Sequence, residues 1–461
     1  MIPLTPARRD AAHPRRGGVA MAALLGAAVL ALMAASTLLT VAFTDYEAEA
    51  LPAVSQLTAG HLGAFLGTLP AYGGSLVLRA PFALAAHAAG GGELAVYRVL
   101  ALPCLAAALL LGVHLFARLA PRDGRTALAP WLALAVVVAN PLILPALDTG
   151  HPEELLGAVL CAAGVMAAFA DRPVAAGVLL GLAGANKAWA VLAVLPALVA
   201  LRHGRVTFVL VAGALCGAVL APALLHGTAA TGSARTFAAQ GSQIFQPWQW
   251  SWFLGHHGGV VHGLYGAKVG YRTGPGWVFA LGHLPVLAAP LAAGALAAAR
   301  RIRRDDTLLL LALCFFLRCV VDPWDTAYYH LPLVMALAAH EVVARRRAPA
   351  ATLAMSVAIY ASTVLARDHV SADGQAALYL LWSLPSGAAL VAAVFAPARW
   401  AAFSGQLGAR AAAVLPSLAG ALAPAAQPTT VSSLLSPLST SCPPSVTATR
   451  SSMRTPTAPG T

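Results

Sequence analysis

The segment from Asp322 to His330 carries an unusual set of polar and aromatic side chains. It reads Asp-Pro-Trp-Asp-Thr-Ala-Tyr-Tyr-His, so two acids, three aromatic residues and a histidine fall within nine positions. Aromatic rings offer large apolar faces, and carboxylates accept hydrogen bonds from hydroxyl groups. The segment therefore predicts a site for a polyhydroxylated ligand. The predicted binding residues are Asp322, Asp325, Tyr328, Tyr329 and His330. The alternative is that the aromatic residues belong to the belt found at membrane interfaces.

A second polar segment, Asp148-Thr149-Gly150-His151, is followed by Pro152, Glu153 and Glu154. Proline suits the first turn of a helix, and acids in that turn complement the helix dipole. These structural roles account for Pro152 and both glutamates. They leave Asp148 and His151 unexplained, and we predict that these two residues bind a ligand.

Asp45 follows the first apolar run of the chain and is itself followed by Tyr46 and Glu47. An acid at the boundary between water and lipid could act as a general base on a hydroxyl group. We therefore predict that Asp45 is catalytic and that Tyr46 beside it contacts substrate. The alternative is an ordinary carboxylate at a helix end.

Lys187 lies in the short sequence Asn186-Lys187-Ala188-Trp189, between two apolar runs. A lysine within a membrane is costly and normally has a partner or lies on a ligand pathway. It could bind an anion such as a lipid phosphate. The alternative is that the side chain extends to the membrane surface.

The segment 227–276 is the second long stretch between apolar runs, after 44–93. It holds several tryptophans together with His257, His262, Lys268 and Arg272. Long loops in compact proteins are usually functional or disordered, and the aromatic residues argue against disorder here. We predict that these four polar residues take part in substrate binding.

Sequence spacing predicts no cofactor. A site for a hard divalent cation is conceivable from Asp45, Asp148, Asp322 and His151, because such ions take several oxygen ligands. The spacing of these residues gives that site no further support. The six cysteines show no zinc-site or disulfide spacing, and five of them lie in apolar runs as packing residues would. Phosphate-loop and dinucleotide motifs are also missing from the sequence.

The composition identifies what must position these residues. Hydrophobic residues make up 59% of the 461 positions and charged residues only 10%, whereas soluble domains carry about 25% charged residues. The chain is therefore predicted to be an all-α polytopic membrane protein. Its net charge of +12 comes from short clusters between apolar runs, which report membrane orientation and not a nucleic-acid partner.

A membrane-spanning helix needs about 20 mostly apolar residues. The predicted spans are 19–43, 94–117, 127–147, 153–170, 173–185, 188–201, 205–226, 277–299, 307–321, 331–344, 350–366 and 375–396. Arginine clusters near positions 118–125, 172, 202–205, 300–304 and 345–347 are predicted to be cytoplasmic. Because both 172 and 202 belong on that side, two short helices, either spanning or re-entrant, are predicted to turn around Asn186-Lys187.

This topology divides the chain into three parts. Residues 1–18 form a basic cytoplasmic N-terminus, and 19–396 form the transmembrane domain with extracytoplasmic loops at 44–93 and 227–276. Within the first loop, 75–89 is predicted to be interfacial or re-entrant. Residues 397–461 are rich in Pro, Ser, Thr and Ala, and are predicted to form a cytoplasmic, largely disordered tail.

The arrangement resembles a known class of membrane enzymes. An aspartate just after the first helix, a long outer loop and many short apolar helices resemble the GT-C membrane glycosyltransferases. The run Gly177–Ala183, then Asn186-Lys187 and an apolar run ending in Leu195-Pro196, resembles the polyprenyl-phosphate-mannose-dependent mannosyltransferases of glycosyltransferase family 87. The chain departs from that family at His151, where Gln is frequent, and at Ala71-Tyr72-Gly73-Gly74, where a Tyr-Pro-Pro-like element is frequent. These departures leave the sugar and the acceptor open.

The resemblance implies a GT-C-like bundle in the cell membrane. The apolar runs and the arginine clusters predict 11–12 transmembrane helices with both termini cytoplasmic. The resemblance also implies inverting transfer of a hexosyl or mannosyl group from a polyprenyl-phosphate donor to a glycan or glycolipid acceptor on the outer face. Asp45 would be the base, and Asp148, Asp322, Tyr328 and Tyr329 would position the sugars. The leaving phosphate would be stabilised by Lys187, Lys268 and Arg272, assisted by His257 or His262. A multi-pass transporter or lipid flippase is the alternative.

Overall fold

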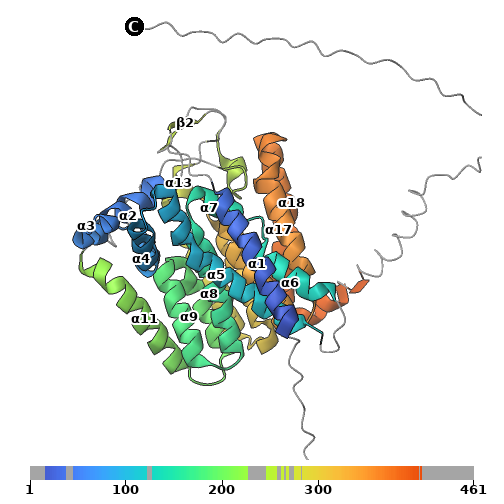
Figure 1. Ribbon diagram of the computed structural model, residues 1–461. Coiled ribbons are helices and arrows are strands. Elements are labelled where there is room, and N and C mark those ends of the chain that lie inside the picture. The colour runs from blue at the N-terminus through green and yellow to red at the C-terminus, as the bar shows by residue number, and fades with distance from the viewer. Residues whose placement is uncertain are drawn as a thin grey trace, which may run out of the picture. The chain divides into compact units, whose positions relative to one another are not determined.

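The computed structural model describes residues 16–37, 45–121, 127–226, 246–256, 261–263, 266–268, 272, 275–281, 283–403 and 405–406. Most of them are helical, as expected for a chain rich in alanine and leucine (Figure 1). The first part contains α1 (Arg16–Ser36), η1 (Tyr46–Ala50), α2 (Leu51–Thr58), α3 (Leu62–Gly67), α4 (Gly73–Ala88), α5 (Glu93–Leu119), α6 (Leu128–Val138), α7 (Ile143–Thr149), α8 (Pro152–Phe169), α9 (Pro173–Asn186), η2 (Ala188–Ala193), α10 (Val194–Ala200) and α11 (Arg205–Leu225).

The second part begins with η3 (Trp252–Leu254) and a short antiparallel pair of strands, in which Val261 pairs with Lys268 and Gly263 with Gly266. The remaining elements are β1 (Val261–Gly263), β2 (Gly266–Lys268), α13 (Gly276–Leu281), α14 (His283–Ala299), η4 (Arg304–Asp306), α15 (Thr307–Val321), η5 (Ala327–His330), α16 (Leu331–Ala339), η6 (His340–Ala344), α17 (Ala350–Thr363), η7 (Leu365–Asp368) and α18 (Ala372–Phe395).

The helices match the predicted spans and confirm an all-α polytopic membrane protein. Among the described residues, seven helical stretches are long and apolar enough to cross a membrane. They are Gly17–Ser36, Glu93–Leu119, Leu128–Thr149, Pro152–Phe169, Arg205–Leu225, Ala350–Asp368 and Ala372–Phe395. Pro173–Asn186, Ala188–Ala200 and Leu284–Ala299 are apolar but shorter. The first helix ends at Ser36, earlier than predicted, and 38–44 lie outside the described residues.

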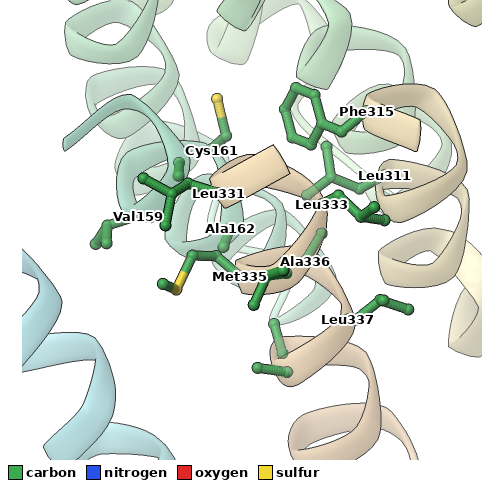
Figure 2. Close-up of a cluster of buried hydrophobic side chains, with 14 of the residues drawn as sticks. Val159, Cys161, Ala162, Leu311, Phe315, Leu331, Leu333, Met335, Ala336 and Leu337 are labelled. Carbon is green, nitrogen blue, oxygen red and sulfur yellow. The ribbon is translucent and has the colours of Figure 1, made fainter. Parts of the chain in front are cut away.

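The centre of the bundle is formed by α8, α15 and α16, whose apolar side chains interlock (Figure 2). This cluster contains Val159, Cys161 and Ala162 of α8 together with Leu311 and Phe315 of α15. The long helix α1 packs against α5 and α6, and α11 packs against α9, and both leave much of their surface exposed. Because lipid solvates exposed apolar side chains, this pattern is expected at the edge of a membrane bundle.

The segment predicted as the first outer loop is folded into helices. Residues 46–88 form η1 and α2 to α4, and together with the start of α5 they enclose a second apolar cluster that includes Phe65, Leu76 and Leu100. The predicted interfacial segment 75–89 corresponds to α4, which packs against α5, α9 and α11. Residues 46–88 therefore form a packed helical layer, and Tyr46, which follows Asp45 directly, is part of its apolar cluster.

The predicted arginine-rich turns gather at one end of the bundle. Arg346 donates to the backbone oxygen of Arg118 at 3.2 Å, and Arg304 donates to that of Ala200 at 2.9 Å. The backbone NH of Arg202 donates to Asp171 at 3.0 Å. The two short helices between Arg172 and Arg202 turn at Lys187, as the charge pattern predicts. Lys187 thus lies toward the opposite end from these arginines.

Candidate active site

His151 lies at the centre of a polar cluster formed between α7 and α8. Its Nε2 lies 3.0 Å from Oδ2 of Asp45, and its Nδ1 lies 2.7 Å from Oε1 of Glu153. The structure therefore brings Asp45 and His151 together although 106 positions separate them in the chain. The Asp45 side chain is 26% exposed, whereas that of Glu153 is fully buried. Of these two acids, Asp45 is therefore the one that a ligand can contact from the protein surface.

The close approach of Asp45 depends on a glycine. Gly150 ends α7 with φ of +97°, which an L side chain rarely adopts. A Cβ there would lie 2.6 Å from the backbone nitrogen of Tyr46. The end of α1 is held by Arg98, whose Nη2 donates at 2.8 Å to the backbone oxygens of both Ala35 and Thr37. Asp45 itself is held over this turn by its contact with His151.

Two buried glutamates extend the cluster inward, and buried cations balance them. Nζ of Lys187 lies 3.2 Å from Glu153 and 2.9 Å from Glu154. Arg79 lies 3.3 Å from Glu153, and Arg318 lies 3.8 Å from Glu154. Because an unpaired charge in a dry interior is very unfavourable, this reciprocal pairing is what allows both carboxylates to remain buried.

Lys187 is placed by the turn that ends α9. Nδ2 of Asn186 donates to the backbone oxygen of Glu153 at 2.8 Å, while its Oδ1 accepts from the Ser75 hydroxyl at 2.8 Å. Lys187 itself is extended, with φ of −155°, so the helix stops there. A 14-residue helix rises about 21 Å, which is shorter than the roughly 30 Å hydrocarbon layer. The short α9 therefore ends at Lys187 before a full span is completed.

Aromatic rings surround these charges. The rings of Tyr72 and Tyr328 lie 5.4 Å and 5.2 Å from the His151 ring, and Lys187 lies over Tyr72 at 4.7 Å. Arg318 lies between two rings, 4.8 Å from Trp189 and 4.5 Å from Tyr329. Aromatic faces stabilise cations and also offer apolar surface to a ligand. The turn that carries Tyr328 and Tyr329 is thereby brought against the His151 turn.

The electrostatic surroundings determine the protonation of His151. Burial lowers its pKa and so does Lys187, whereas Glu153 and the hydrogen bonds to Asp45 and Glu153 raise it, and the net effect is a pKa of about 10. The ring is therefore a cation at neutral pH, and both nitrogens donate to carboxylates. Nearby, burial raises the pKa of Glu49, which lies within the field of His151 and Asp45.

The other predicted site residues are distributed more widely. Tyr46 is buried against Tyr97 at 4.6 Å, and Asp148 is exposed at the end of α7. The Asp322 carboxylate caps the loop by accepting from the backbone NH of Trp324 at 2.8 Å. Arg272 pairs with Asp373 on α18 at 2.9 Å. His257 lies outside the described residues, and the side chains of His262 on β1 and Lys268 on β2 do so too.

Asp325 and His330 form a separate buried group with Cys319. Within the described part of the chain, this is the only group of three or more His, Cys, Asp and Glu residues whose ligand atoms lie close enough for one metal ion. Asp45, Asp148, Asp322 and His151 do not form such a group.

Sequence reasoning missed several members of the cluster. Arg79 and Arg318 are absent from the predicted site residues. Each is a charged residue inside an apolar run, which is the sequence signal for a functional or paired charge. Glu153 and Glu154 were explained as complements to a helix dipole. Their burial and their cationic partners were not visible in the sequence.

Comparison with known proteins identifies the family. The model of glycosyltransferase family 87 matches residues 73–323, more than half of the chain. This range includes Arg79, His151, Lys187 and Arg318, and it begins after Asp45. Neither the curated proteins nor the solved structures contain a match. The chain therefore belongs to glycosyltransferase family 87, and it is a membrane glycosyltransferase that joins a sugar from a donor to an acceptor.

Proposed function

We propose that the protein transfers a hexosyl group, such as mannosyl, from a polyprenyl-phosphate donor to a glycan or glycolipid acceptor. Transfer takes place on the extracytoplasmic side of the cell membrane with inversion at the anomeric carbon, and both termini are cytoplasmic. The observation that carries this proposal is the partly exposed Asp45 carboxylate held by the buried His151. The arginine-rich turns at the other end of the bundle support the orientation.

In this reaction Asp45 is the general base. The acceptor hydroxyl oxygen forms a bond to the anomeric carbon, its proton passes to Asp45, and the bond from that carbon to the phosphate oxygen breaks. His151 cannot accept the proton, because it is already charged at neutral pH. Its role is to orient Asp45 and to keep that carboxylate ionised before the reaction. Glu153 holds the other ring nitrogen and so fixes the imidazolium in place.

Lys187 is the residue best placed to meet the departing phosphate. Among the cations of the cluster its side chain is 14% exposed, compared with 4% for both Arg79 and Arg318. A phosphate arriving from the membrane would therefore contact Lys187 first. The two more deeply buried arginines would add to the positive electrostatic potential at that position. Cationic groups placed where negative charge develops lower the barrier of such a step.

The sugar is proposed to bind beside the aromatic rings next to His151. Tyr328 and Tyr329 contact each other edge to face at 5.3 Å, and Tyr72 lies on another side of His151. The exposed Asp148 and the buried Asp322 are proposed to accept hydrogen bonds from sugar hydroxyls. Arg272 and the segment with His257, His262 and Lys268 are proposed to contact the acceptor or the lipid from the outer side.

The test is the Asp45→Asn variant in membranes supplied with a labelled polyprenyl-phosphate mannose and an acceptor extract. Loss of a general base should lower transfer by about 10²- to 10⁴-fold. The matched control is Asp305→Asn, because Asp305 is a partly exposed aspartate among the arginine-rich turns. Folding is checked by size-exclusion chromatography and thermal unfolding. Full transfer by a folded Asp45→Asn variant would refute the role of Asp45, and a retained anomeric configuration in the product would refute inversion.

A further inference from the structure

Cys319, Asp325 and His330 come together where α15 ends and the chain turns into α16. All three side chains are fully buried, and one ligand atom from each lies within 4.8 Å of the others. Cys319 is in the last turn of α15, while Asp325 and His330 belong to the loop and η5 that follow. The proposed sugar transfer uses none of the three directly.

The hydrogen bond at the far side of the His330 ring defines its tautomer. Nδ1 lies 3.2 Å from the backbone oxygen of Thr326. A carbonyl oxygen only accepts, so Nδ1 carries the hydrogen and Nε2 of the neutral ring presents a lone pair. This is the arrangement by which proteins orient a histidine toward a metal ion.

The lone pair of His330 faces an acid. Nε2 lies 3.4 Å from Oδ2 of Asp325, so two acceptors confront each other. Nε2 of His330 and Oδ1 of Asp325 are also buried without a hydrogen-bond partner among the described residues. Buried polar atoms are almost always satisfied, because a buried donor or acceptor without a partner is unfavourable. A proton or a metal cation must therefore lie between these groups.

The third donor distinguishes a metal site from a simple acid–imidazole pair. Sγ of Cys319 is within reach of both groups, and the set comprises sulfur, imidazole nitrogen and carboxylate oxygen. Sulfur and imidazole suit Zn²⁺ and related transition metals, whereas Mg²⁺ and Ca²⁺ prefer oxygen alone. A thiolate and a carboxylate would neutralise a divalent ion in this dry position. We propose that Cys319, Asp325 and His330 bind one transition-metal ion of the Zn²⁺ type.

Neighbouring residues support such a site. The Tyr379 hydroxyl donates to Oδ2 of Asp325 at 3.1 Å, and the Tyr379 and Trp382 rings lie 6.3 Å and 6.0 Å from the His330 ring. Hydrogen bonds of this kind orient the ligands and tune metal affinity. The ion would tie the loop between α15 and α16 together and so hold Tyr328 against His151. The proposed metal site does not depend on the identity of the proposed sugar donor.

The decisive measurement is the metal content of the full-length protein, purified without a polyhistidine tag. The protein is loaded with Zn²⁺, freed of excess metal and analysed by inductively coupled plasma mass spectrometry. One Zn²⁺ per chain is expected, and Cys319→Ser should lose it. The matched control is Cys314→Ser, since Cys314 is a buried cysteine of the same helix outside the group. Less than stoichiometric metal in the folded wild type would overturn the proposal, as would full retention in Cys319→Ser.

Two further measurements keep the proposal testable if Cys319→Ser fails to fold. Replacing Zn²⁺ by Co²⁺ in the wild type should give the charge-transfer absorption of a thiolate ligand, and its absence would exclude Cys319. The Tyr379→Phe variant keeps all three ligands but removes the hydrogen bond to Asp325, so metal affinity should fall by about 10- to 100-fold. Unchanged affinity would contradict the geometry proposed here.

Discussion

Replacing Lys187 by methionine tests whether the buried charge cluster holds the site together. The methionine keeps the length and the apolar stem of the side chain but removes the charge. Lys187 lies 3.2 Å from Glu153 and 2.9 Å from Glu154, and both carboxylates are fully buried. Removing one partner of a buried pair typically costs about 3–5 kcal/mol, because an uncompensated charge is left behind.

The remaining partners place the expected value at the lower end of that range. Glu153 keeps Arg79 and His151, and Glu154 keeps the indole NH of Trp189 at 3.3 Å. We therefore expect Lys187→Met to lower the free energy of unfolding by about 3 kcal/mol. The assay is unfolding of the purified protein in mixed micelles with increasing sodium dodecyl sulfate, followed by circular dichroism.

A control and a double-mutant cycle separate the charge from the packing. Arg303→Met removes an exposed cation paired with Asp305, and its expected effect is about 0–1 kcal/mol. Glu154→Gln combined with Lys187→Met should show a coupling of about 0.5–3 kcal/mol, because the neutral glutamine removes a negative charge that the loss of the lysine would otherwise leave uncompensated. If Lys187→Met is no less stable than Arg303→Met, or if the cycle is additive, the interpretation of the cluster is wrong.

Two further predictions concern the turn that carries His151. Gly150→Ala forces a side chain into a left-handed backbone and against Tyr46, so it should lower the free energy of unfolding by about 1–3 kcal/mol and also lower sugar transfer. The control is Gly213→Ala on α11, where the added Cβ meets no neighbouring atom and transfer should be unchanged. Because the pKa of His151 in the folded protein is raised to about 10 from 6.5, its contribution to stability is complete below pH 6.5 and is lost as the pH rises toward 10. The melting temperature of the wild type should therefore fall more between these pH values than that of His151→Gln, and parallel pH profiles of the two proteins would contradict the raised pKa.

The proposed metal and the proposed base are independent of each other. The His151 ring contacts Tyr328, which lies between Asp325 and His330 in the chain, and Cys319 donates to the backbone oxygen of Tyr329 at 3.2 Å. Removing the Asp45 carboxylate should lower transfer strongly without changing metal content. Removing Cys319 should lower metal content first and reduce transfer only as the loop loosens.

The sequence alone determined the membrane class and the helices, because both depend on local properties. Long apolar runs can only be buried in lipid or in a protein core, and their lengths identify the spans. The arginine clusters predicted which turns gather at one end, and the close positions of Arg172 and Arg202 predicted the paired short helices that turn at Lys187. Family resemblance, carried by the run from Gly177 to Lys187, agrees with the match to glycosyltransferase family 87.

Only the tertiary structure decided which polar residues meet. Asp45 and His151 are 106 positions apart, and Arg79 and Glu153 are 74 apart, so no local pattern links them. Their contact depends on helices packing closely enough to exclude water, as where Gly150 admits the backbone of Tyr46. The same packing separated Arg272 from the cluster and gathered Cys319 with Asp325 and His330. Charges buried by packing must find partners, and those partners are set by the fold and not by spacing along the chain.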